Sequence, residues 1–317
     1  NIDSLYFQSD KPNVHEVLLG SKNKLICDYI IGPKLINKMN LDAVWFTKYI
    51  VPFGVKAKTI TTVHDMAYFM PALNAYTLKD TIYMRIAIRN SCSRADKIVA
   101  VSENTKQDII NILPVNEEKI CVIHEAADTR FRVFENREEV ESFRKRMSLP
   151  RRFVLFTGGI SPRKNLIRLF EAFKDVSRAT DCKLVLTGNK GWRNKDILSF
   201  LQGREDIVRI GFVQDEDMPA LYNAAEVFVY PSLYEGFGLP IIEAACCGTP
   251  VVCARGSSLT EVGGDGVLFV DPKDTKDIAR KIILLLNNRE ESQALIKKGF
   301  ANAERFSWDK SAAQLSE

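Results

Sequence analysis

Short apolar runs alternate with amphipathic stretches along nearly all of this 317-residue sequence. The runs are rich in Val, Ile and Phe, as in strands that a parallel sheet buries on both faces. The stretches between them carry apolar residues at helical spacing. This alternation predicts repeated βαβ units, and therefore an α/β fold with parallel sheets. Strands, the first four of them buried, are expected at residues 43–46, 59–63, 98–101, 121–123, 153–157, 183–187, 207–210, 227–230, 251–254 and 267–270. Helices are expected at residues 81–94, 105–113, 164–178, 217–225, 240–247 and 274–287.

A charged stretch, Glu135–Arg146, divides the pattern into two series, and we interpret it as a partly helical connection between domains. A chain of this length can form two domains, each with its own core. We predict two Rossmann-like domains, at residues 1–148 (with the connection) and 149–300, and a terminal segment at 301–317. Ligands of such sheets bind beyond the carboxyl ends of the strands, so the expected site is the cleft between the domains.

The composition restricts the class of protein. Hydrophobic residues make up 46% of the chain and charged residues 26%, which is typical of a soluble globular protein. No apolar run approaches the roughly 20 residues that span a bilayer. The seven cysteines are scattered, and neither a Cys-x2-Cys pair nor a His cluster indicates a metal site. We therefore expect a cytoplasmic protein with reduced thiols and no bound metal.

The net charge of +4 is small and argues against nucleic acid as the main partner. The charge is unevenly distributed, because residues 21–60 contain seven lysines and only two aspartates. These are Lys22, Lys24, Lys34, Lys38, Lys48, Lys56 and Lys58, with Asp28 and Asp42. One interpretation is a solvated cationic face. The other is peripheral contact with anionic lipid headgroups at the inner face of a membrane, which contributes about 1 kcal/mol per basic residue near the surface.

Tyr230–Val252, with the sequence YPSLYEGFGLPIIEAACCGTPVV, combines two carboxylates with a glycine-rich turn and an apolar helix. Pro240 suits the first helical position, where its missing N–H costs nothing. The free N–H groups of that turn and the helix dipole can hold a phosphate. Gly236 and Gly238 allow backbone to approach a ligand closely. Because Glu235 and Glu243 flank this turn, they can accept hydroxyl groups on either side of a phosphate, as in a nucleotide sugar. An ordinary loop followed by a packing helix is the alternative.

A second segment, Gly158–Asn165, follows the first predicted strand of the second domain. Ser161 can cap a helix there and Pro162 suits its first position. Arg163 and Lys164 then lie at the positive end of the helix dipole, where cations cost stability unless an anion binds beside them. The alternative is a pair of surface cations that point into water.

Together these segments resemble the family 4 retaining glycosyltransferases, whose signature Glu-x7-Glu reads Glu235-GFGLPII-Glu243 here. Gly248-Thr249-Pro250-Val251-Val252 and the Pro-Arg-Lys-Asn element are similar to that family as well. The resemblance implies the GT-B fold, in which two Rossmann-like domains face each other across a cleft. It also implies that Glu243 binds the ribose and Glu235 the donor sugar. Arg163, Lys164 and the amides around Gly238–Pro240 would hold the diphosphate. No metal or other cofactor is then needed, because these cations neutralise the leaving group.

Thr61–Met66 ends a predicted strand and places His64 at the edge of the cleft. A lone His is often a structural residue, but the match to the family's strand-His-Asp element implies that His64 lies against the transferred sugar. Asp65 fits either an orienting or a turn residue. The catalytic residues expected from the resemblance are His64, Arg163, Lys164 and Glu235.

Further segments are similar to the family and complete the expected donor site. Gly211-Phe212-Val213 resembles the loop that packs on the nucleobase, and Gly188–Gly191 would line the same pocket. Residues 94–102 and 122–131 are interpreted as structural, with Ser102 as a helix cap and possible cleft contact. Asp215–Asp217 resembles a metal-binding Asp-x-Asp signature, but its place at the start of a helix favours capping. The donor contacts expected are Gly158, Gly159, Arg163, Lys164, Gly188, Phe212, Val213, Ser232, Glu235, Gly236, Phe237, Gly238, Leu239, Pro240 and Glu243.

The resemblance covers residues from about 40 to the C-terminus and implies that the segment from Phe306 returns to the first domain. The Gly-rich loop that opens the family's first domain has no counterpart in residues 1–40, so an incomplete N-terminal domain is expected. Residues 5–9, LYFQS, fit either a native strand or a protease cleavage sequence.

The function expected is transfer of a sugar, with retention of configuration, from GDP-mannose or a UDP-sugar to a hydroxyl of a carbohydrate or lipid-linked acceptor. Synthesis of a surface polysaccharide or glycolipid is the expected setting. Two alternatives remain open: a nucleotide-sugar epimerase or hydrolase on the same fold, and a non-catalytic subunit that binds nucleotide sugar.

Overall fold

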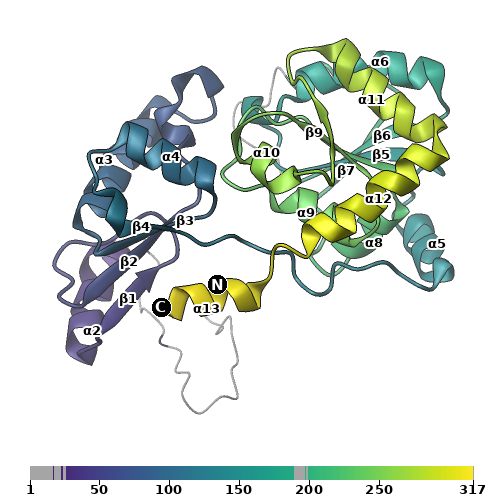
Figure 1. Ribbon diagram of the computed structural model, residues 1–317. Coiled ribbons are helices and arrows are strands. Elements are labelled where there is room, and N and C mark those ends of the chain that lie inside the picture. The colour runs from purple at the N-terminus through teal and green to yellow at the C-terminus, as the bar shows by residue number, and fades with distance from the viewer. Residues whose placement is uncertain (1–16, 18–22, 24–25, 189–196, 198, 317) are drawn as a thin grey trace.

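The computed structural model describes residues 17, 23, 26–188, 197 and 199–316, which form two α/β domains joined by a connecting segment (Figure 1). The first domain contains a sheet of four strands in the order β1-β2-β3-β4, all parallel. The strands are β1 (Ala43–Phe46), β2 (Lys58–Val63), β3 (Lys97–Ala100) and β4 (Ile120–Val122). Parallel neighbours need crossover connections, and helices provide those between β2 and β3 and between β3 and β4.

The first domain has two long crossover helices, α3 (Leu78–Arg94) between β2 and β3 and α4 (Glu103–Ile112) between β3 and β4. Each begins at a hydroxyl cap: Thr77 accepts a hydrogen bond from the N–H of Asp80, and Ser102 from that of Thr105. The shorter elements are η1 (Cys27–Ile31), α2 (Gly32–Met39), η2 (Ala67–Phe69), η3 (Pro71–Leu73) and η4 (Glu117–Lys119).

Side chains of β3 alternate between the two faces of the first sheet, as the pleat requires. Ile98 and Ala100 belong to the core cluster that also contains Ile88 of α3. Val99 and Val101 face the other way, into a cavity that the last helix, α13 (Trp308–Ser316), also lines. One face of this strand therefore packs in the core of the first domain, and the other face lines the cavity beside α13.

The second domain contains a parallel sheet of six strands in the order β10-β9-β8-β5-β6-β7. They are β5 (Phe153–Thr157), β6 (Lys183–Thr187), β7 (Ile207–Gly211), β8 (Val227–Tyr230), β9 (Val251–Ala254) and β10 (Leu268–Val270). The chain order reverses between β5 and β8 at the centre of the sheet, so the carboxyl ends of these two strands form a topological switch point.

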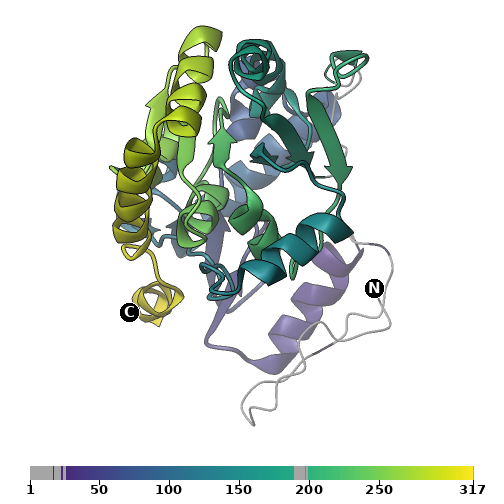
Figure 2. The same ribbon diagram turned by 90° about the vertical axis from the view of Figure 1, so that its right-hand side faces the viewer.

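Helices cover both faces of the second sheet (Figures 1 and 2). They are η5 (Pro162–Lys164), α6 (Leu166–Ala179), α8 (Met218–Ala224), α9 (Leu239–Cys246), α10 (Ser257–Gly263), α11 (Thr275–Asn287) and α12 (Arg289–Ala303). Helix α6 packs against α11, and α9 packs against α12. The strands β5, β8 and β9 are buried along their whole length, so this domain has the larger core.

Two segments run between the domains. The chain crosses to the second domain after β4, where α5 (Arg137–Arg146) packs against α8 and Phe143 joins the second core. At the other end α13 returns to the first domain, where the Ser311 hydroxyl donates to the carbonyl of His124. The bounds 1–148, 149–300 and 301–317 stay predictions.

The predicted α/β fold with two parallel sheets is confirmed. The expectation that the first four strands are all buried is wrong, because β1 and β4 are edge strands: Trp45 is 47% exposed and Cys121 is exposed. Within the described residues, no helix is long and apolar enough to cross a membrane. The predictions for residues 5–9, Lys22, Lys24 and the loop after Gly188 lie outside the described residues. Lys34, Lys38, Lys48, Lys56 and Lys58 are exposed, and the two interpretations of this charge stay predictions.

Candidate active site

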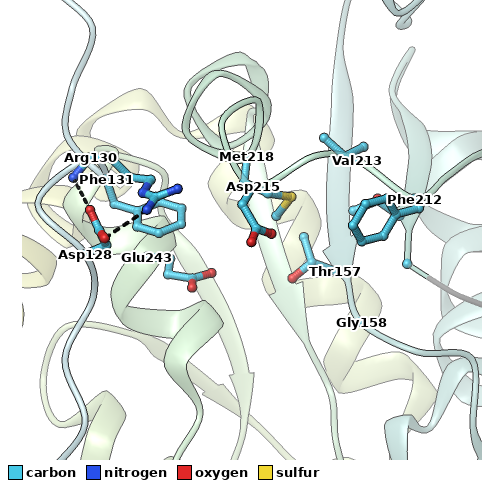
Figure 3. Close-up of a pocket in the computed structure, with 12 residues that line it drawn as sticks. Asp128, Arg130, Phe131, Thr157, Gly158, Phe212, Val213, Asp215, Met218 and Glu243 are labelled. Atoms are coloured by element: carbon cyan, nitrogen blue, oxygen red, sulfur yellow. Dashed lines mark hydrogen bonds and ion pairs between the residues drawn. The ribbon is translucent and has the colours of Figure 1, made fainter. Parts of the chain in front are cut away.

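A cavity of about 360 Å³ lies at the carboxyl ends of β5, β6 and β7 (Figure 3). Its lining residues come from both the second domain and the connecting segment. They are Asp128, Arg130, Phe131, Thr157, Gly158, Thr187, Gly188, Phe212, Val213, Asp215, Met218 and Glu243. The cavity therefore occupies the place where doubly wound sheets bind their ligands.

Two glycines form part of the cavity wall, at positions where a residue with a side chain would not fit. Gly158 and Gly188 directly follow β5 and β6, with φ of 134° and 131°. A Cβ at Gly188 would lie 2.2 Å from the carbonyl oxygen of Gly158. Both positions thus leave backbone exposed to a ligand, because any side chain there would be strained or would clash.

Glu243 on α9 points its carboxylate into the cavity (Figure 3). The hydroxyl of Tyr222 donates to its Oε2 at 2.8 Å and lies 3.2 Å from the hydroxyl of Thr157. Burial raises the pKa of Glu243, while the bond from Tyr222 opposes that shift. A half-buried carboxylate oriented in this way can accept hydrogen bonds from a sugar diol.

Next to this cavity, Arg163 and Lys164 form a buried ion cluster with Glu235. Lys164 Nζ lies 2.7 Å from Oε1 of Glu235, and Arg163 Nη1 lies 3.1 Å from Oε2. Lys164 Nζ also donates to the hydroxyl of Tyr230 at 2.5 Å, and Arg163 Nη1 lies 3.7 Å from Oδ2 of Asp65. Lys164 is 8% exposed and Glu235 is 7% exposed. Each charge is therefore stabilised by the opposite charge of its partner and not by water.

The pKa values in this cluster follow from burial and pairing. Burial alone would raise the pKa of Glu235, but the charges of Lys164 and Arg163 outweigh burial and lower it. Burial lowers the pKa of Lys164, and Glu235 only partly offsets this. For Arg163, burial would lower the pKa, but Glu235 and Asp65 raise it. The carboxylate of Glu235 therefore stays ionised while two cations share it.

The ion cluster and the cavity meet at Gly158. A Cβ placed on Gly158 would lie 3.4 Å from Cε and 3.6 Å from Nζ of Lys164. The ammonium group thus lies behind the backbone that lines the cavity. A ligand that extends from Glu243 past Gly158 would meet positive charge, which suits a nucleoside with a diphosphate attached.

His64 lies on the first domain and lines a different cavity, of about 430 Å³. Its Nδ1 lies 3.0 Å from Oε1 of Glu125, and its Nε2 lies 2.7 Å from the carbonyl oxygen of Thr47. The Glu125 hydrogen bond raises the pKa of His64 above its ordinary value, against the opposing effect of burial. Both ring nitrogens therefore have partners, and the carbonyl oxygen of His64 is the group that faces the second domain, beside Gly236.

We expect Glu125→Gln to lower the pKa of His64, because the neutral amide no longer favours the imidazolium. A raised folded pKa means that this pair stabilises the protein below about pH 6.5, the unfolded value, and loses that contribution as pH rises through the folded pKa. NMR titration of the imidazole C–H resonances measures the shift, with Glu117→Gln at an exposed ion pair as control. An unchanged His64 titration in Glu125→Gln would contradict the assignment.

Comparison with known proteins places this chain in a family. Residues 138–301 match the family described as Glycosyl transferases group 1, and residues 32–131 match Glycosyltransferase Family 4. The chain belongs to the glycosyl transferases group 1 family. O-antigen chain mannosyltransferase B of Escherichia coli is 34% identical over 263 residues, which are 81% of this chain and 68% of that protein. Serotype-specific mannosyltransferase WbdA of Escherichia coli is 29% identical over 278 residues, which are 84% of this chain and only 34% of that protein.

Solved structures support the same fold. Sucrose-phosphate synthase of Thermosynechococcus elongatus superposes with a TM-score of 0.74 at 20% identity, covering 90% of this chain and 75% of that one. HepE of Anabaena, solved in complex with UDP and glucose, gives 0.75 at 18% identity, with 93% and 82% covered. The family and the GT-B fold that the sequence predicts are thus confirmed.

In this group 1 glycosyltransferase, the predicted donor residues fall into three places. Gly158, Gly188, Phe212, Val213 and Glu243 line the cavity, and Gly159 follows in the same loop. Arg163, Lys164 and Glu235 form the ion cluster, with the buried Ser232 beside Glu235. Gly236, Phe237, Gly238, Leu239 and Pro240 form the turn into α9. Phe237 packs on His124 and Phe306 at the domain junction, so only its backbone can serve a donor.

Several cavity residues of this glycosyltransferase were not predicted from the sequence. Thr157 and Thr187 each end a strand just before a cavity glycine, and the repeated Thr-Gly after an apolar run is a signal that could have revealed them. Asp128, Arg130 and Phe131 lie in a segment interpreted as structural. Asp65 accepts from the N–H of Ala67 and also approaches Arg163, so the turn and orienting roles combine.

The acidic residues before α8 were expected to cap this helix, and their side chains do not. Asp217 is the N-cap residue, but it makes no side-chain cap bond; its carboxylate pairs with Arg146 instead. Asp215 faces the cavity. Ser161 likewise makes no side-chain cap bond before η5. Among the described residues, no three His, Cys, Asp or Glu side chains are grouped so as to hold a metal ion.

Proposed function

We propose that this chain transfers mannose from GDP-mannose to a hydroxyl of a carbohydrate or lipid-linked acceptor, with retention of configuration, during polysaccharide synthesis. The observation that carries the proposal is the junction at Gly158, where the Glu243 cavity meets the buried cations of the ion cluster. A nucleoside diphosphate sugar fits this arrangement: its ribose diol would face Glu243, its diphosphate would face the cations, and its sugar would lie beyond them.

Each of these residues would then have its own role in the reaction. Glu243, oriented by Tyr222, accepts the ribose hydroxyls. Arg163 and Lys164 neutralise the charge that develops on the departing diphosphate, so the reaction needs no metal. Glu235, held ionised by these two cations, accepts hydroxyls of the donor sugar. The bond between the anomeric carbon and the diphosphate oxygen would break, the acceptor oxygen would bond to that carbon on the same face, and the departing diphosphate would take the acceptor proton.

The choice of mannose rests on relatives. O-antigen chain mannosyltransferase B and WbdA of Escherichia coli are both named for mannose transfer, and the former is 34% identical to this chain. Their names also suggest a surface polysaccharide as the product. A UDP-sugar donor is the alternative that the same ribose and diphosphate contacts would accept.

A donor panel tests the proposal. Transfer of radiolabelled sugar from GDP-mannose, UDP-glucose and ADP-glucose to a mannose-terminated oligosaccharide should occur with GDP-mannose, and NMR of the product should show the donor's anomeric configuration. Release of nucleotide without an acceptor would support a hydrolase or epimerase instead. Binding of donor with no turnover would support a non-catalytic subunit.

Glu243→Gln should weaken the binding of GDP about 10- to 100-fold, because a neutral amide accepts weaker hydrogen bonds from the ribose than a carboxylate. Isothermal titration calorimetry measures this Kd directly. Glu205→Gln on the exposed surface is the matched control and should bind GDP like the wild type. Equal affinity of Glu243→Gln and wild type would remove Glu243 from the ribose site.

A further inference from the structure

The turn that carries Glu235 is held from the opposite domain. The carbonyl oxygen of Gly236 accepts hydrogen bonds from the hydroxyls of Ser102 at 2.6 Å and Thr105 at 3.0 Å. Both hydroxyls are on residues with 0% exposure. Ser102 and Thr105 are three residues apart at the start of α4, so they share one face of that helix.

One turn further along α4, a third side chain contacts the same segment of the second domain. Asp108 Oδ2 accepts from the hydroxyl of Tyr234 at 2.8 Å, and this hydroxyl accepts from the N–H of Met66 at 3.0 Å. Both partners of the Tyr234 hydroxyl therefore lie in the first domain. The carbonyl oxygen of Tyr234 accepts from Arg163 Nη1 at 3.3 Å, which links the same residue to the ion cluster.

The second domain holds α4 in return. Glu261 of α10 accepts from the N–H groups of Glu103 at 3.0 Å and Asn104 at 3.1 Å, and it lies 2.8 Å from Nε2 of His124. A carboxylate at a helix N-terminus satisfies free N–H groups and complements the dipole. The second domain therefore stabilises the first turn of α4, in addition to the cap that Ser102 provides.

We infer that α4 positions the segment Tyr234–Gly236: Tyr234 and Thr105 are positioning residues that complete the alignment of Glu235 and Arg163 when the two domains are in contact. Their hydroxyls act on the reaction through the segment Tyr234–Gly236. Separation of the domains would break the hydrogen bonds from Ser102, Thr105 and Asp108 at once, and would leave the segment held by the second domain alone, where the Ser258 hydroxyl donates to the carbonyl of Glu235. Catalytic alignment is thereby coupled to domain closure. The inference rests on the proposed function for its kinetic consequence and not for the contacts themselves.

Tyr234→Phe and Thr105→Val test this inference, since each removes a hydroxyl and keeps the shape of the side chain. We expect kcat for mannose transfer to fall about 10- to 100-fold, as small misplacements of catalytic groups do, while the Kd for GDP changes less than about three-fold. Amide hydrogen exchange at residues 103–106 should be faster in both variants. Tyr83→Phe is the matched control, because its hydroxyl pairs with Tyr29 within the first domain and its loss should change neither measurement.

The two readouts separate this inference from the proposed function. If wild type transfers no sugar from any donor, the proposed function fails, and hydrogen exchange still decides whether α4 and the turn are coupled. Faster exchange in Tyr234→Phe and Thr105→Val, but not in Tyr83→Phe, supports the coupling. Exchange and kcat that match the control in both variants would overturn it. A fall in kcat that occurs together with a lower Tm, and without faster exchange, would also overturn the coupling, because a purely structural role predicts that result.

Discussion

Replacing Arg163 and Lys164 together by alanine should reduce kcat/KM for sugar transfer by at least about 1,000-fold, because loss of even one preorganised donor to a developing negative charge costs 100-fold or more. Both cations approach one carboxylate, Glu235, and Lys164 Nζ also lies beside the cavity at Gly158. Removal of the pair leaves the departing diphosphate without the two cations that lie beside Glu235. Steady-state kinetics with GDP-mannose measures the loss.

The same change should lower stability, because it leaves Glu235 buried without a partner. Breaking a buried ion pair from one side costs about 3–5 kcal/mol, so the single variant Lys164→Ala should lower Tm as well. The lowered pKa of Glu235 sets the pH dependence. Its contribution to stability is present above the unfolded carboxyl pKa of about 4.3 and is lost as pH falls through the lower folded value.

A matched control keeps the prediction specific. Lys174 and Arg178 lie exposed on α6 and pair with acidic residues one turn away, Glu171 and Asp175. Their joint replacement by alanine removes the same two charges and should leave kcat/KM unchanged within about two-fold, since such surface pairs contribute little. Near-normal transfer by the Arg163→Ala, Lys164→Ala variant would refute the role assigned to this cluster and the proposed mechanism with it.

The strands of the second domain could be predicted almost to the residue, because a sheet buried on both faces leaves uninterrupted apolar runs. β5 and β8 show this: all of their residues are buried. In the first domain the burial of the strands was less predictable than their position: β1 lies at the predicted residues, but as an edge strand it mixes exposed and half-buried positions. Burial at an edge depends on neighbours distant in sequence, which periodicity does not encode.

The candidate site divides in the same way. Glu243, Arg163 and Lys164 could be found because their motifs are local: a turn, a helix start and a fixed spacing. The partners of His64 could not, because Glu125 lies 61 residues away and contacts it only after β2 and β4 have each paired with β3. Gly236 was predicted to admit a ligand, and instead its Cα faces the carbonyl oxygen of His64 across the domain contact.

Gly236→Ala should therefore abolish transfer, by more than about 100-fold in kcat, while leaving the second domain folded. An added Cβ would lie 1.6 Å from the carbonyl oxygen of His64 and 2.8 Å from Cβ of Asp65. Both clashing groups belong to the first domain, and Gly236 does not have the positive φ that would strain an alanine. The backbone carbonyl of His64 has no room to move aside in a close-packed contact. The added methyl group should therefore force the domains apart instead of unfolding either one.

Small-angle scattering should show a larger radius of gyration for Gly236→Ala than for wild type, and calorimetry should show GDP binding retained, since the cavity lies in the second domain and the connecting segment. Gly299→Ala is the matched control: it is helical, and its added Cβ would meet Ala245 at an ordinary 3.5 Å. Normal kinetics in Gly236→Ala would mean that the enzyme transfers sugar with His64 and Gly236 apart. In that case the domain contact of this structure would not be the catalytic arrangement, and the positioning role of α4 would fall with it. Retained GDP affinity with lost turnover would instead assign binding to the second domain and catalysis to the contact between the two.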